Sequence, residues 1–203
     1  KSTYKMLLIG LTGGIGSGKT FISKIINSYK KFKIFDSDFE AKKIIKNNPE
    51  VISSIKNSFG PLAYVKNNLN KKYISEVVFS DLKKLKLLNQ IVHPKVFEAL
   101  EIYKTKNSDK IIIIESALLF ESGMYINNDI NILVVSPVEL RLDRITKRDN
   151  ITREKAKQII NSQWKDSKKI SLADFIIENI NKLETEKVLK NLIKDILSKY
   201  EKN

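Results

Sequence analysis

Short apolar runs recur along the chain, and longer segments with apolar residues at helical spacing separate them. Such runs, several of them rich in branched side chains, are typical of strands buried on both faces of a sheet. Strands are therefore expected at 6–12, 33–35, 111–114, 130–135 and 173–177.

The segments between these runs predict helices. The longest is a mostly helical stretch over 39–106, whose one clear interruption is 58–70, where Gly60-Pro61 marks a turn. Within it, a helical repeat indicates a face that packs into the core: Leu82, Leu85, Leu88, Ile91 and Val92. The other helices are expected at 20–29, from 136 to about 149, from Thr152 onward and at 184–200.

Alternating strands and helices predict an α/β fold, in which a doubly wound parallel sheet of about five strands is flanked by helices. The chain has no internal repeat, no low-complexity linker and no sign of a second core. We expect a single domain with a helical insertion.

Composition excludes several classes of protein. The 203 residues include no cysteine, which excludes a disulfide framework and thiol catalysis and fits a cytoplasmic enzyme. No apolar run has the length of a membrane span, and residues 1–4 do not begin a secretory signal.

The formal net charge of +14 raises the question of a polyanionic partner. Nearly all of the excess is lysine scattered along the chain, whereas nucleic-acid-binding proteins usually concentrate their charge in a patch. A lysine-rich surface that serves small phosphorylated substrates is favoured, and a non-catalytic nucleic-acid-binding protein is the alternative from another class.

The most specific motif is Gly13-x4-Gly18-Lys19-Thr20, a complete phosphate-loop pattern between a predicted strand and a predicted helix. Its glycines let backbone N–H groups ring a phosphate, and the next helix adds its positive N-terminus. Lys19 would reach the β- and γ-phosphates, and the Thr20 hydroxyl would ligate the magnesium ion that bridges them.

Missing motifs narrow the class of phosphate-loop protein. No aspartate has a glycine three residues later, and the nearest match to a guanine motif is the segment 181–184, which argues against a switch GTPase. The run 111–115 ends in the single acid Glu115, not in the aspartate of most motor ATPases. A small-molecule kinase remains.

A kinase needs a carboxylate that orients or deprotonates the acceptor hydroxyl. Asp36 and Asp38 directly follow the second predicted strand, at the edge of the sheet where ligands bind. One residue here should also cap the following helix, and Ser37 or Asp38 is expected in that position.

Arg141, Arg144 and Arg148 share one face of a predicted helix, because they are spaced i, i+3 and i+7. Surface ion pairs are the plain explanation, but three of only four arginines on one face favour contact with phosphate. Arg148 and Arg153 bracket the break at 150–152, which suggests a lid that closes over ATP. His93, which precedes a proline at an expected helix start, is given no catalytic role.

The chain resembles the dephospho-coenzyme A kinase family over nearly its whole length. The segments similar to that family are LTGGIGSGKT (11–20), FDSDFEA (35–41), HPKV (93–96), ESALLFESG (115–123), SPVELRLDRITKRDNITRE (136–154), Gln163 and ADFIIEN (173–179). Departures are Ala117 in place of a common proline, Glu178 in place of a frequent aspartate, and no glycine after Asn179.

The resemblance implies transfer of the γ-phosphoryl group of ATP, with Mg²⁺, to the ribose 3′-hydroxyl of dephospho-coenzyme A. The alternative is another small kinase acting on a nucleoside, a nucleotide or a sugar acid. Asp38 is the first choice as base, Asp36 is second or an outer-shell magnesium group, and Arg148 would stabilise the transferring phosphoryl group. Lys19 completes the catalytic set.

Binding residues follow by the same resemblance. Those expected to contact the nucleotide are Thr12, Gly13, Gly14, Ile15, Gly16, Ser17, Gly18, Lys19, Thr20, Phe21, Arg144, Arg148 and Asn179. Those expected to contact the acceptor are Asp38, His93, Leu118, Leu119, Phe120 and Glu121.

The resemblance also divides the single kinase domain. The nucleotide-binding core covers about 1–38, 107–149 and 170–203, the acceptor-binding insertion about 39–106 and the lid about 146–169. Neither nucleic acid nor membrane is an expected partner, and the protein should be a monomer or a small homo-oligomer in the cytoplasm.

Overall fold

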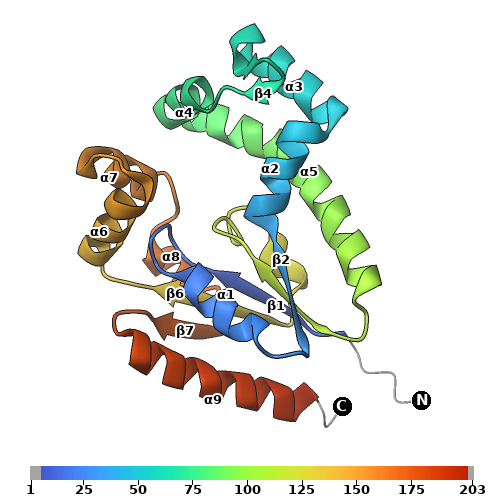
Figure 1. Ribbon diagram of the computed structural model, residues 1–203, viewed down its shortest axis with the longest axis vertical. Coiled ribbons are helices and arrows are strands. Elements are labelled where there is room, and N and C mark those ends of the chain that lie inside the picture. The colour runs from blue at the N-terminus through green and yellow to red at the C-terminus, as the bar shows by residue number, and fades with distance from the viewer. Residues whose placement is uncertain (1–5, 201–203) are drawn as a thin grey trace. The chain divides into compact units, whose positions relative to one another are not determined.

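The computed structural model describes residues 6–200 (Figure 1). Residue contacts divide the chain into two compact units. The first contains the described residues up to Phe35 and from Lys104 onward, and the second is Asp36–Tyr103. The predicted features of residues 1–5 and 201–203, the ends of the expected core and the missing secretory signal, lie outside the described residues.

A five-stranded sheet forms the centre of the first unit, in the order β2-β5-β1-β6-β7. The central strand β1 pairs in parallel with β5 on one side and β6 on the other, and β6 pairs in parallel with β7. The strands are β1 (Leu8–Thr12), β2 (Phe32–Asp36), β5 (Ile111–Glu115), β6 (Ile130–Val135) and β7 (Phe175–Glu178). The predicted doubly wound sheet and its strands are confirmed, with ends shifted by one or two residues.

Helices cover this sheet. Figure 1 shows α9 (Lys182–Tyr200, red) and α1 (Lys19–Asn27, blue), whose apolar residues join those of the strands in one core cluster. Ile22 and Leu189 are fully buried there, and burying one such side chain is worth about 1.5–3 kcal/mol. The remaining helices of the unit are η2 (Met124–Asn127), α6 (Val138–Asp149), α7 (Arg153–Asn161) and α8 (Asp166–Ile170).

The second unit is mostly helical, as predicted, but has more breaks than the one expected at 58–70. Its elements are α2 (Ser37–Asn47), α3 (Pro49–Phe59), η1 (Pro61–Ala63), β3 (Tyr64–Val65), β4 (Asn68–Leu69), α4 (Lys71–Ser80) and most of α5 (Leu82–Lys106). The break at Asn48 arises because its side chain accepts a 3.1 Å hydrogen bond from Val51 N and Pro49 occupies the first helical position. The β3–β4 hairpin was not predicted, since Lys66 and Asn67 make its turn with positive φ and no glycine.

The apolar repeat in α5 is only partly a core face. Val92 is buried as predicted, whereas Leu82 is 69% exposed, so its assignment to the core is wrong. The helix start expected at His93-Pro94 is also wrong, because α5 runs through both residues. Burial lowers the pKa of His93 below its ordinary 6.5, which keeps this imidazole neutral at pH 7.

No helix in the described part of the chain is long and apolar enough to cross a membrane.

Candidate phosphate-binding site

The glycine loop lies at the carboxyl end of β1 and ends where α1 begins at Lys19. Gly16 and Gly18 have φ angles of 79° and 98°, which glycine adopts readily and other residues rarely do. Gly18 is the N-cap of α1, and no side chain caps this helix end. A helix start without a side-chain cap favours a bound anion, and the sequence predicts a phosphate at this point.

Side chains outside the loop hold its carbonyl groups. Arg141 Nε donates to Ile15 O at 2.9 Å, and Arg144 Nη1 donates to Gly16 O and Ser17 O at 3.2 and 3.3 Å. Because the C=O and the next N–H of a trans peptide point in opposite directions, the N–H groups of Gly16 and Gly18 point away from these arginines. This orientation is what a ring of phosphate donors requires.

The residues that directly follow β6 and β7 also bind the loop. Asn179 Nδ2 donates to Ser17 O at 2.8 Å, and Ser136 Oγ lies 3.1 Å from the same oxygen. Arg144 Nη2 also donates to Asn179 O at 3.1 Å. The sequence predicts that Arg144 and Asn179 contact the nucleotide, and in the structure both side chains bind the carbonyl groups of the loop. Their contact with a nucleotide stays a prediction.

Lys19 lies across the loop, with Nζ donating to Gly13 O at 2.8 Å. Its ammonium group and the start of α1 place positive charge at the same point. The hydroxyls of Thr12 and Ser17 are buried, and neither has a hydrogen-bond partner among the described residues. Such buried hydroxyls are uncommon in folded proteins, and a polar ligand or water usually completes their bonding.

Arg141 supports the loop, a role the sequence did not predict. Its side chain is 5% exposed, and Nη1 lies 3.2 Å from Asp166 Oδ2. Burial lowers the pKa of its guanidinium group, which stays charged beside Asp166. A Cβ on Gly14 would overlap this group, so Gly14 is needed for the close approach. The one sequence signal for this role was the spacing that places Arg141 and Arg144 on the same face of a helix.

Arg148 and Arg153 form ion pairs at the surface of the protein. Arg148 binds both oxygens of Asp149 at 2.7 Å, which raises the pKa of the arginine and lowers that of the aspartate. Arg153 pairs with Asp143 and Glu139. The catalytic role of Arg148 stays a prediction.

The predicted helix break at 150–152 is confirmed. Asn150 has a positive φ of 50°, and Thr152 caps α7 by accepting a hydrogen bond from Lys155 N. A hinged lid at this break stays a prediction.

The acceptor-side residues fall in both units. In the second unit Asp36 caps α2, because its carboxylate accepts a 2.8 Å hydrogen bond from Phe39 N. Neither Ser37 nor Asp38 is the cap. The predicted cap is therefore wrong, because α2 begins two residues earlier than expected. Asp38 lies half-buried in the first turn of α2, and its role as base stays a prediction.

The segment after β5 carries the acceptor residues of the first unit. Leu119 and Phe120 are buried, and Phe120 packs edge-on against Tyr125 with ring centroids 5.2 Å apart. Leu118 is half-buried. Glu121 accepts a hydrogen bond from Trp164 N at 3.1 Å. Contact of these residues with an acceptor stays a prediction.

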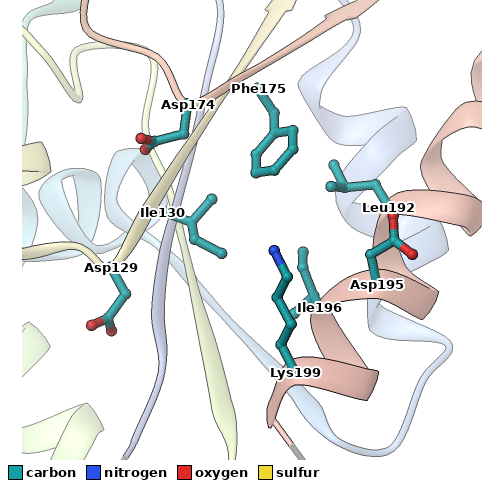
Figure 2. A pocket seen from close by; sticks show the side chains of 8 residues that line it. All are labelled: Asp129, Ile130, Asp174, Phe175, Leu192, Asp195, Ile196 and Lys199. Atoms are coloured by element: carbon teal, nitrogen blue, oxygen red, sulfur yellow. The ribbon is translucent and has the colours of Figure 1, made fainter.

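A cavity of about 270 Å³ lies at the opposite end of the strands, where β6 and β7 begin, beside α9 (Figure 2). Asp129 and Asp174 accept hydrogen bonds from Leu8 N and Asn131 N, so they fix strand starts. The cavity is lined by Asp129, Ile130, Asp174, Phe175, Leu192, Asp195, Ile196 and Lys199. It is not part of the phosphate-binding site.

Alanine at Gly18 should damage this site specifically. Its φ of 98° strains an L-residue, and its Cβ would overlap Asn179 Nδ2, so we expect the Kd for ADP to rise at least about tenfold. Titration calorimetry measures this directly. Gly123→Ala is the matched control, because φ is 79° there but the nearest atom is 3.7 Å away. Equal ADP affinity in the two variants would contradict this account of the loop.

The parallel sheet, the glycine loop after its central strand and the lysine across that loop define a nucleotide-binding protein of the P-loop kinase class. Comparison with known proteins specifies the family. Residues 7–185 match the family model described as dephospho-CoA kinase. The chain belongs to the dephospho-CoA kinase family.

Individual relatives agree with this assignment. A dephospho-CoA kinase from Fusobacterium nucleatum is 43% identical over 180 residues, which cover 88% of this chain and 92% of the relative. The structure of a dephospho-CoA kinase from Campylobacter jejuni has a TM-score of 0.65 and 32% identity, covering 93% of this chain and 96% of its own. A crystal structure from Thermus thermophilus has a TM-score of 0.81 and 29% identity, covering 96% of this chain and 98% of its own.

Proposed function

We propose that this chain transfers the γ-phosphoryl group of ATP to the ribose 3′-hydroxyl of dephospho-coenzyme A, which gives coenzyme A and ADP, the last step of coenzyme A synthesis. The match of residues 7–185 to the dephospho-CoA kinase family supports the acceptor. The donor side is supported by the loop over 13–18, whose carbonyl groups are bound from outside by Arg141, Arg144 and Asn179. A loop held in this way presents N–H groups to a phosphate without having to reorganise during the reaction.

Donor-side residues have separate roles in this proposal. The backbone of Gly13–Gly18 cradles the β-phosphate, and Lys19 neutralises charge on the β- and γ-phosphates. Arg148 contributes positive charge to the transferring group when the lid is closed. Breaking its exposed pair with Asp149 would cost little, because such pairs are worth about 0–1 kcal/mol.

Magnesium fits this site as a companion of the nucleotide. Thr20 is exposed in the first turn of α1, where its hydroxyl is our proposed ligand. Within residues 6–200 no group of three or more His, Cys, Asp or Glu side chains could hold a metal ion. This suits Mg²⁺, which commonly binds phosphate oxygens, water and few protein groups. The ion would neutralise developing charge on the phosphates.

On the acceptor side, Asp38 is our proposed base for the 3′-hydroxyl. Asp36 caps α2 by accepting a hydrogen bond from Phe39 N, and Asp38 lies half-buried in the first turn of the same helix. The insertion 39–106, with its residue His93, and the segment 118–121 are each our proposed contacts of the acceptor. The monomeric or small homo-oligomeric state and the cytoplasmic location remain predictions.

A substrate panel tests the reaction. With ATP as donor, the purified chain should turn over dephospho-coenzyme A, and ADP release with a nucleoside, a nucleoside monophosphate or a sugar acid should stay near background. Phosphorylation of a nucleoside monophosphate but not of dephospho-coenzyme A would overturn the proposal in favour of another small kinase.

The net charge of +14 should attract both multiply phosphorylated substrates. Added salt screens this attraction, since the Debye length falls to about 3 Å at 1 M. We therefore expect KM for both substrates to rise between low and high NaCl, while kcat changes less. Initial rates at matched pH measure the effect, and a flat KM would count against a role for the charge.

A further inference from the structure

The chain that connects α7 to α8, together with α8 itself, contacts the phosphate loop and the arginine that holds it. Gln163 Oε1 accepts a hydrogen bond from Ile15 N at 2.8 Å. Asp166 binds Arg141 at 3.2 Å, and Arg141 donates to Ile15 O at 2.9 Å. Residues 163–169, which we call the linker segment, therefore control both the N–H and the C=O group of Ile15.

The same linker segment is attached at its other side to the chain that follows β5. Trp164 N donates to Glu121 Oε1 at 3.1 Å, and Lys169 Nζ lies 2.9 Å from that oxygen. The Lys169 side chain is 0% exposed and that of Glu121 is 12% exposed. An ammonium group removed from water so completely requires a charged partner, and Glu121 is the one that the described residues provide.

We propose that the buried Glu121–Lys169 ion pair is a positioning device for the phosphate loop. It fixes the linker segment, and the linker segment then holds Ile15 in the conformation that binds nucleotide. Glu121 acts on the loop through Trp164 and Lys169. The inference rests on the proposed function only in requiring that the loop binds a nucleotide.

The geometry explains how a pair outside the loop can act on it. Binding of Ile15 O by Arg141 turns the N–H of Gly16 toward the interior of the loop. If the linker segment shifts, Asp166 moves away from Arg141 and Gln163 moves away from Ile15 N, so both contacts break. Both constraints on the loop are then lost together, and the loop must be ordered by the nucleotide itself. Ordering on binding reduces affinity.

The first test removes the direct contact of the linker segment with the loop, the hydrogen bond from Ile15 N to Gln163, and leaves the constraint through Asp166 and Arg141 in place. Gln163→Ala should weaken ADP binding at least fivefold, with a melting temperature close to that of the unmodified protein. Lys165→Met is the matched control, since Lys165 is an exposed residue of the same segment and should leave ADP affinity unchanged. An ADP affinity within twofold of the unmodified protein in Gln163→Ala would overturn the proposal.

The second test separates positioning from stability. Lys169→Leu should lower both the melting temperature and the ADP affinity, because it leaves the Glu121 carboxylate buried without its partner. The double variant Glu121→Leu/Lys169→Leu removes both buried charges, so its melting temperature should recover. Its ADP affinity should stay at least fivefold weaker than that of the unmodified protein, since Trp164 N no longer has a hydrogen-bond acceptor. Recovery of affinity together with melting temperature would show a purely structural pair and overturn the proposal.

Trp164 is the only tryptophan in the chain and lies within the linker segment, so its fluorescence reports on this segment without a label. ADP should change this fluorescence in the unmodified protein and not in Gln163→Ala at saturating ADP. An equal change in both would contradict the coupling. No acceptor is present in these titrations, so their outcome is independent of the kinase assay with dephospho-coenzyme A. The positioning proposal and the proposed function can therefore be contradicted separately.

Discussion

Lys19→Ala is expected to lose most of the turnover, with kcat falling on the order of 100- to 1,000-fold. Lys19 Nζ already lies at the loop, 2.8 Å from Gly13 O, and its charge would follow the β- and γ-phosphates through the transition state. The start of α1 sets the position of this lysine. Steady-state kinetics with saturating ATP and acceptor measure the loss.

The control for this variant is Lys24→Ala, which removes an exposed lysine from the same helix. Its kcat should stay within about twofold of the unmodified enzyme, since single exposed charges contribute little. A Lys19→Ala enzyme that keeps more than a tenth of its kcat would contradict the role of this lysine in phosphoryl transfer.

Asp38→Asn is expected to lower kcat about 100- to 10,000-fold, the usual contribution of a general base. The Kd for ATP should change little, because the substitution leaves the loop intact. A large loss in kcat with nucleotide binding preserved is the signature of an interaction made in the transition state. Pre-steady-state rates and ATP titration together measure the two quantities.

Asp36 supplies the comparison for this second variant. Asp36→Asn should keep near-normal kcat and stability, because asparagine is as good a helix cap as aspartate. Asp36→Ala should destabilise the protein by about 1 kcal/mol through loss of the bond to Phe39 N. If Asp36→Asn loses kcat and Asp38→Asn does not, the base is Asp36.

The sheet and the loop were predictable from sequence because their signals are local. A buried parallel strand is a continuous apolar run, and β1, β5 and β6 each coincide with one. The loop pattern depends on the backbone freedom of its glycines, and Gly16 and Gly18 have the positive φ angles that glycine adopts readily. The break at 150–152 had a local signal as well, in the cap residue Thr152.

Other features depend on local signals that were overlooked or are weak. Asn48-Pro49 is a recognisable helix boundary, yet it was overlooked within the mostly helical stretch predicted over 39–106. The turn at Lys66 and Asn67 has no glycine, so nothing in the sequence marks the hairpin clearly. The exposure of Leu82 shows that a helical apolar repeat need not be buried along its whole length.

The supports of the loop were not predictable, since they join residues far apart in sequence. Arg141 and Ile15 are 126 positions apart, and Asn179 and Ser17 are 162 apart. Lys169 is one lysine in a lysine-rich chain, and only the fold reveals that it is fully buried against Glu121. Sequence spacing indicated that the arginines share a face, but not that the face holds the loop's carbonyl groups.

The most direct test of the central claim is to locate the transferred phosphoryl group. The purified chain would be incubated with γ-¹⁸O-labelled ATP, dephospho-coenzyme A and Mg²⁺, and the product analysed by mass spectrometry and ³¹P NMR. We predict one labelled phosphate on the ribose 3′-oxygen, formed together with one equivalent of ADP. Label at the 2′-oxygen, or ATP turnover without labelled coenzyme A, would contradict the account.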